Sequence, residues 1–162
     1  MSEARTPPPP VVLDWDLSRS HGAADVGWTD VERDQRFWQG VIRLTLKLPG
    51  RTVEFDLADV RAERKGDQIS ALVLRGHPQA LDEAYAEVAR RMRELDLPRR
   101  DLDQWRDDVR SADFKKDRVF ATRRNDLRPA LSLEVKHTYD DERPWYLSWE
   151  IAWPSSPPAP AR

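Results

Sequence analysis

Titratable side chains that could carry catalysis or bind a metal are scattered along this sequence. The histidines are His21, His77 and His137, and no two of them have the spacing of three to five residues that places a metal-binding pair on one helical face. The chain has no cysteine, which excludes thiol catalysis, disulfides and Cys-ligated zinc. His137 falls on the inward face of an expected strand, where a hydrogen-bonded structural histidine is favoured over a catalytic one.

Two groups of carboxylates could perform acid–base chemistry or bind a hard cation. Asp14 and Asp16 share the polar face of one expected strand, where they could act as general acid and base. An edge strand protected by charge explains them equally well. Asp140, Asp141 and Glu142 crowd the tip of an expected hairpin, but this run lacks the spaced ligands and the glycine of a calcium loop. We interpret it as a solvated turn and expect neither a metal nor a cofactor.

Phosphate and nucleic-acid chemistry has no clear signature either. The six glycines are not clustered, and no nucleophile elbow, phosphate loop or dinucleotide fingerprint is present. The segment 115–128 is locally basic and has a phenylalanine within it and one just before it, a mixture that can bind single-stranded nucleic acid. The net charge of the whole chain is −2, however. We therefore favour a solvated strand whose arginines pair with the acids of residues 14–34, and expect no nucleic-acid partner.

Length and composition predict one domain with a substantial core. The 162 residues include seven tryptophans, which are too large to leave in water. We expect the domain to span 11–153, between a disordered proline-rich arm at 1–10 and a similar tail at 154–162. No signal peptide is visible, and no stretch approaches the roughly 18 apolar residues of a membrane span. The sequence as written predicts a soluble, cytoplasmic protein, or an extracytoplasmic one if a leader has been removed.

Apolar residues recur at helical spacing in two neighbouring segments. In 78–97, steps of four and three residues place five apolar side chains on one helical face: Leu81, Tyr85, Val88, Met92 and Leu95. Pro78 suits a first helical position, and Leu97-Pro98 ends the run. In 101–112, a shorter stripe consists of Leu102, Trp105 and Val109. We predict two helices, each burying a single face.

Alternating apolar and polar residues predict strands on both sides of these helices. The expected strands are 11–17, 37–48, 52–57, 59–64, 69–74, 118–124, 131–139 and 145–153. A proline–glycine turn would place Leu46 opposite Val53, and a loop at 140–144 would place Val135 opposite Trp149. Both registers bring the apolar residues of a hairpin to one face. We predict an α+β fold in the order strands, helix, helix, strands, with a curved antiparallel sheet of about six to eight strands and both helices on one face.

The C-terminal hairpin suggests where such a domain could bind. The stripe Trp145, Trp149 and Trp153 could line a site for an apolar small molecule, but a helix with a matching stripe is available to cover it. The opposite face carries Tyr146, and tyrosine is frequent at binding surfaces. We hypothesise that this face binds a partner protein, through Tyr146, Lys136, Glu134, Asp140, Asp141 and Glu142.

The function that we expect is therefore non-catalytic. A protein-interaction module fits best, such as an inhibitor, an immunity-type protein or a component of an assembly. A carrier of an apolar small molecule between sheet and helices is the first alternative, and a cavity beside the tryptophan stripe would favour it. An enzyme with a dispersed site is the second, and a cleft holding titratable groups with shifted pKa values would favour it.

Overall fold

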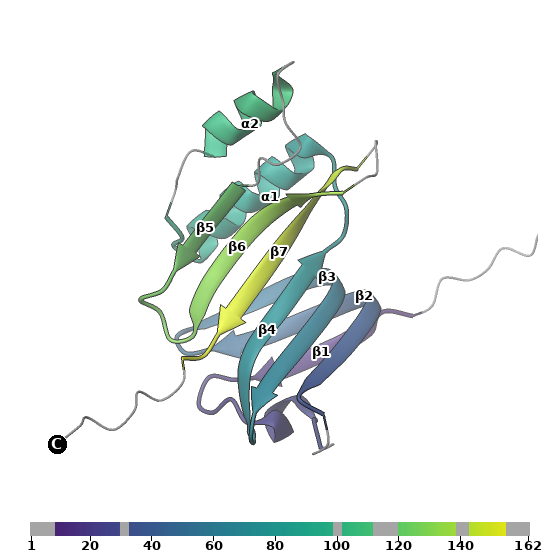
Figure 1. Ribbon diagram of the computed structural model, residues 1–162, viewed down its shortest axis with the longest axis vertical. Coiled ribbons are helices and arrows are strands. Elements are labelled where there is room, and N and C mark those ends of the chain that lie inside the picture. Colours follow the sequence, from purple (N-terminus) through teal and green to yellow (C-terminus); the bar gives the residue numbers. More distant parts are fainter. Residues whose placement is uncertain (1–8, 30–32, 99–101, 112–119, 139–142, 155–162) are drawn as a thin grey trace, which may run out of the picture.

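The sheet of this protein has seven strands and runs through the whole molecule (Figure 1). The computed structural model describes residues 9–29, 33–98, 102–111, 120–138 and 143–154. Their elements are β1 (Val11–Asp16), the 3-10 helix η1 (Ala23–Val26), β2 (Gln35–Leu48), β3 (Arg51–Lys65), β4 (Gln68–Gly76), α1 (Leu81–Glu94), α2 (Leu102–Arg110), β5 (Phe120–Arg124), β6 (Ala130–His137) and β7 (Trp145–Ala152). This confirms the predicted α+β fold and its order of strands, helices and strands.

The strand order is β1-β2-β3-β4-β7-β6-β5, so that β4, whose segment 71–74 is apolar on both faces, lies in the middle. Neighbouring strands are antiparallel except for β1 and β2, which are parallel. The parallel pair is possible because η1 lies between the end of β1 and the start of β2 in the chain. The C-terminal strands β5 to β7 join the N-terminal ones only through the β4–β7 ladder.

A bulge bends the long hairpin of β2 and β3. The expected strands 52–57 and 59–64 form the single strand β3, whose register shifts between Leu57 and Asp59, opposite a shift in β2 between Gln39 and Ile42. A bulge adds one residue and reverses which side chains face inward. Odd-numbered side chains before it and even-numbered ones after it are therefore buried: Val53, Phe55 and Leu57, then Val60 and Ala62. The prediction of two separate strands was wrong because this change of phase resembles a break.

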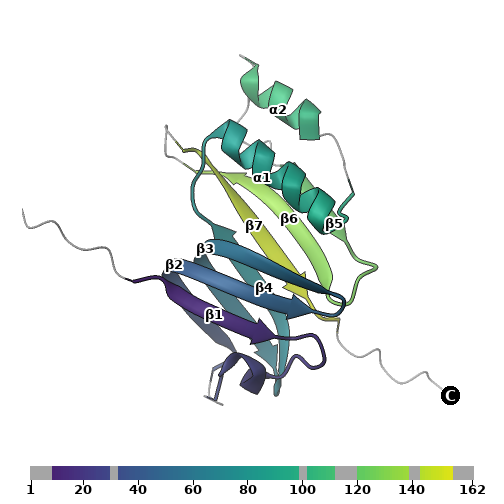
Figure 2. The same ribbon diagram turned by 180° about the vertical axis from the view of Figure 1, so that it is seen from behind.

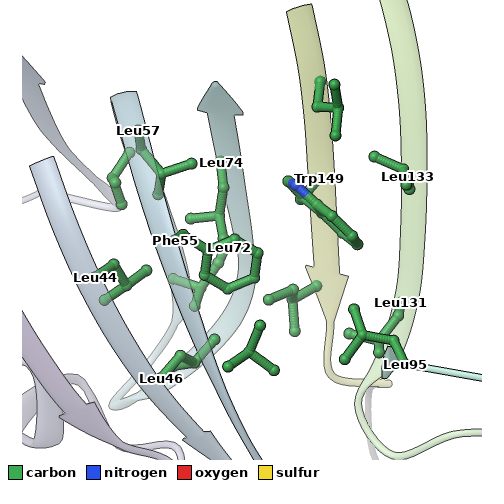
Figure 3. Close-up of a cluster of buried hydrophobic side chains, with 14 of the residues drawn as sticks. Leu44, Leu46, Phe55, Leu57, Leu72, Leu74, Leu95, Leu131, Leu133 and Trp149 are labelled. Carbon is green, nitrogen blue, oxygen red and sulfur yellow. The ribbon is translucent and has the colours of Figure 1, made fainter. Parts of the chain in front are cut away.

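The curled sheet encloses most of its own core. Leu44, Leu46 and Phe55 of the bent hairpin point toward Trp149 of β7 and Leu133 of β6 (Figure 3). Five of the seven tryptophans are buried: Trp15, Trp28, Trp105, Trp145 and Trp149. Trp153, the last member of the predicted stripe, is only partly buried and packs against the edge of this core.

Both helices lie on one face of the sheet, as predicted. Helix α1 runs across β5 to β7 on that face, which is turned toward the viewer in Figure 2. Its apolar stripe is buried through Val88 and Met92. Helix α2 adds Trp105, whose ring lies 5.1 Å from that of Trp145 and 6.1 Å from that of Phe120. No helix in the described ranges is both long and apolar enough to cross a membrane.

The predicted register of the C-terminal hairpin was wrong by two residues. Trp149 lies opposite Leu133, and Val135 lies opposite Leu147. The pairing begins at His137 and Trp145, so the connection is two residues longer than expected. The Leu46–Val53 register of the first hairpin is confirmed.

Candidate functional site

The candidate binding surface is the outer face of the sheet, which is turned away from α1 and toward the viewer in Figure 1. On this face Tyr146 of β7 lies opposite Lys136 of β6. The guanidinium of Arg75, on β4, stands 4.3 Å from the centre of the Tyr146 ring. Tyr146 is half-buried, so its ring and hydroxyl are held in place yet still reach solvent. A cation over an aromatic ring is stabilising, and here it fixes an aromatic and a positive charge side by side.

Glu134 joins this group through Lys136. The Lys136 Nζ lies 3.5 Å from the Glu134 carboxylate, and both side chains are 43% exposed. At that exposure the ion pair adds little to stability. Glu134 also lines a hollow of about 480 Å³ at the β5 end of the face, together with Pro98, Arg123 and Ser132. The outer face therefore offers a partner both a half-buried aromatic side chain and a recess.

The middle of the outer face consists mainly of polar and charged side chains. One row across six strands consists of Phe37, Arg61, Val73, Glu150, Ser132 and Arg123. The next row consists of Gln39, Asp59, Arg75, Ser148, Glu134 and Ala121. Positive and negative charges alternate along both rows, so the face has no strong field of one sign. Binding there would depend on shape and on local pairs of charges.

The structure brings three of the six predicted site residues together, namely Tyr146, Lys136 and Glu134. The other three, Asp140, Asp141 and Glu142, lie outside the described residues. Two contributors were missed in the sequence. Arg75 was missed because the predicted strand ended at Leu74, although the alternation of inward and outward side chains continues to Arg75. Phe37 is 59% exposed and was counted as part of a core strand, although its odd number sets it apart from the buried even-numbered residues of β2.

The carboxylates Asp14 and Asp16 lie on β1, the outermost strand, and both are exposed. The strand order confirms their interpretation as charges on an edge strand. Asp16 accepts hydrogen bonds from the backbone N–H of Ser18 at 3.0 Å and from its hydroxyl at 2.5 Å. These bonds lower the pKa of Asp16, which keeps the carboxylate charged at neutral pH. A carboxylate so stabilised is a poor general acid.

Two histidines, His137 and His21, pack against tryptophan rings. The His137 ring packs edge-on against Trp145 at 4.9 Å. The Nδ1 of His21 lies 2.7 Å from the carbonyl oxygen of Ile69, and its ring stacks on Trp153 at 5.2 Å. Within the described ranges no group of three or more histidine, aspartate or glutamate side chains is placed to hold a metal ion.

The arginines of the basic segment pair differently from our prediction. Arg124 bonds to Asp126 at 2.6 Å and to Asp96 at 3.1 Å, and the bond from Arg124 lowers the pKa of Asp126. The expected pairing with the acids of residues 14–34 is therefore wrong for Arg124. The reason is the strand order, which puts β5 and β1 at opposite ends of the sheet.

Side chains fill the space between the helices and the tryptophan stripe. Trp145 and Trp149 are each 2% exposed, and Trp149 meets the Phe55 ring at 5.5 Å. Trp105 of α2 covers Trp145. This packing disfavours the carrier of an apolar molecule at that place. Comparison of the chain with family models, curated proteins and solved structures finds no match.

Proposed function

We propose that this chain is a non-catalytic protein-interaction domain that binds its partner across the outer face of the sheet. The observation that carries the proposal is the pairing of Tyr146 with Arg75 on a face that no described element covers, while both helices cover the other face. Tyrosine and arginine are the residue types most enriched at the energetic centres of protein interfaces.

The charges around Tyr146 indicate what the partner presents. Lys136 is already paired with Glu134, whereas Arg75 makes no ion pair within the described residues. A partner carboxylate would complete the hydrogen bonds of the Arg75 guanidinium, and an apolar side chain beside it would cover the Tyr146 ring. We therefore propose a partner segment that combines an acidic residue with an apolar one.

The test is the double variant Tyr146→Ala with Lys136→Glu, compared with the wild-type chain. A partner captured from the native host would first be identified and purified, and its dissociation constant would then be measured by calorimetry. We expect at least about tenfold weaker binding, which is about 1.4 kcal/mol, because truncation of an interface centre typically costs more than 1 kcal/mol.

A matched control exists at the other end of the sheet. Lys47 and Thr52 form a cross-strand pair on β2 and β3 and are both exposed. Lys47→Glu with Thr52→Ala changes the charge by the same amount as the test variant, at two residues that also pair across neighbouring strands. This control should leave the affinity within about twofold of wild type. Unaltered affinity in a folded Tyr146→Ala, Lys136→Glu variant would refute the proposed face.

A further inference from the structure

Strand β1 presents a free backbone edge. It pairs with β2 on one side only, and it is the last strand of the sheet on that side. The Leu17 N–H donates to the Lys47 carbonyl at 2.8 Å, which continues the ladder along the odd-numbered residues. Backbone groups of successive residues in a strand point to opposite sides. The N–H and C=O groups of Val12 and Asp14 therefore point away from β2, where a further strand would lie.

The opposite end of the sheet is covered. The Thr122 hydroxyl of β5 donates to the Pro98 carbonyl at 2.7 Å, and Arg124 reaches Asp96 at 3.1 Å. The segment 95–98 therefore lies beside β5, where it would hinder the addition of a strand. Of the two sheet ends, only the β1 end is open among the described residues.

Exposed apolar side chains gather at this open end. Four large apolar side chains of the described chain are exposed: Val12 at 72%, Phe37 at 59%, Val41 at 48% and Val11 at 37%. Three of the four lie at this end, because Val11 and Val12 belong to β1 and Val41 adjoins Ile42, the residue that pairs with Val11. Phe37 lies farther along β2, opposite Arg61. Exposed apolar residues that gather in one place mark interaction sites more often than scattered ones do.

The charge of the edge determines which strand it can accept. Val12, Asp14 and Asp16 alternate along one face of β1, and Asp14 makes no ion pair or side-chain hydrogen bond within the described residues. A second copy of this chain, added antiparallel over Val12–Asp16, would place Asp14 opposite its own counterpart. Like charges that face each other across strands are destabilising. Lysine or arginine at those positions would instead be attracted.

We propose that the free edge of β1 binds an extended basic segment of a partner protein, which adds to the sheet as an eighth strand. Its lysine or arginine side chains lie against Asp14 and Asp16, and an apolar side chain lies against Val12. This site is separate from the outer face around Tyr146, and its test does not involve those residues.

The test uses synthetic peptides of about eight residues with alternating threonine and valine, since strands of five to six residues are typical. One peptide carries two lysines on the face that meets Asp14 and Asp16, and a second carries glutamates there. A third is the lysine peptide N-methylated at the residues whose N–H groups would bond to β1. Fluorescence anisotropy of the labelled peptides at physiological salt gives the affinities.

The protein variants are Asp14→Lys with Asp16→Lys, and a control, Asp67→Lys with Glu83→Lys, that makes the same change of charge at exposed sites away from β1. We expect wild type and control to bind the lysine peptide equally, and the first variant to bind it about tenfold more weakly, since two attractive cross-strand pairs become repulsive. That variant should instead prefer the glutamate peptide. N-methylation should abolish binding to wild type.

Three results would overturn the proposal. An equal loss of affinity for the lysine peptide in the control variant would show that the net charge of the protein alone attracts the peptide. Unchanged binding of the N-methylated peptide would show that no backbone ladder forms. Absence of lysine-peptide binding to wild type, with the tryptophan near-UV signal intact, would show that the β1 edge accepts no strand.

Discussion

Replacing Trp149 with alanine should lower the free energy of unfolding by about 3–5 kcal/mol, as large aromatic deletions from protein cores do. Trp149 is 2% exposed and sits in the middle of β7, opposite Leu74 of β4 and Leu133 of β6. Its ring meets Phe55 from the bent hairpin, and it lies below the Arg91 guanidinium of α1. Alanine would leave a cavity bordered by four elements, namely β3, β4, β6 and α1.

Urea unfolding followed by circular dichroism measures this effect. Trp153→Ala is the matched control, because Trp153 lies just beyond the end of the same strand, is only partly buried and stacks on His21. Trp153→Ala should lower the free energy of unfolding by clearly less, about 1–2 kcal/mol, since part of the Trp153 surface is already in water. An unchanged denaturant midpoint for Trp149→Ala would show that the ring is not part of the core, and would restore the interpretation of the tryptophan stripe as a ligand-lining face.

Alternation in the sequence predicts which face a residue occupies and leaves the register open. The C-terminal hairpin shows this, since a slip of two residues moved Trp149 from opposite Val135 to opposite Leu133. The odd-numbered apolar side chains of β6 and β7 nevertheless remained on the inner face, because the side-chain period of a strand is two. The register depends instead on the loop, where the Thr138 N–H bonds to the Pro144 carbonyl at 2.6 Å. That contact has no signature in the apolar pattern.

Contacts between strands distant in sequence explain what was missed at the candidate binding surface. Tyr146 and Lys136 were predictable because they belong to one hairpin. Arg75 reaches Tyr146 only because β4 lies next to β7, a neighbour relation that crosses both helices in the sequence. The parallel direction of β1 likewise could not be predicted from the local pattern of residues. Its alternation predicts a strand, whereas its direction relative to β2 follows from the pairing of the folded sheet.

Strand β3 is longer than its neighbour β4, and this affects the way helix α1 is attached. Strand β3 pairs with β4 only from Leu57 onward, so residues 51–56 have β2 on one side and no strand on the other. Helix α1 occupies that side. The Arg91 Nη2 donates to the Glu54 carbonyl, and the Arg51 Nη1 donates to the Leu95 carbonyl at 3.1 Å. Arg91 of the helix therefore supplies one donor, to the Glu54 carbonyl, that a neighbouring strand would otherwise supply.

Arg91 is the central residue of this attachment. It is 4% exposed, and its guanidinium lies 4.9 Å from the Phe55 ring and 3.5 Å from the Glu94 carboxylate. Burial lowers the pKa of Arg91, but the side chain remains protonated at neutral pH. The Arg91 Nε is buried without a hydrogen-bond partner among the described residues, so the Nη groups alone hold the guanidinium. Removing the side chain is costly because the Glu54 carbonyl would lose its donor, and a buried group left unpaired keeps its full desolvation penalty.

We therefore expect Arg91→Ala to lower the free energy of unfolding by roughly 3 kcal/mol, the sum of a charged hydrogen bond and the packing of the aliphatic stem. Arg91→Met keeps most of the stem and should lose only the hydrogen bond, about 1.5–3 kcal/mol. The neighbouring Arg90 is exposed on the same helix, and Arg90→Ala should stay within about 0.5 kcal/mol of wild type. Urea unfolding gives the three values, and hydrogen exchange of the amides in 51–56 reports on the edge itself. If Arg91→Ala unfolded at the same urea concentration as Arg90→Ala, with protection at 51–56 unchanged, α1 would not be what closes this edge.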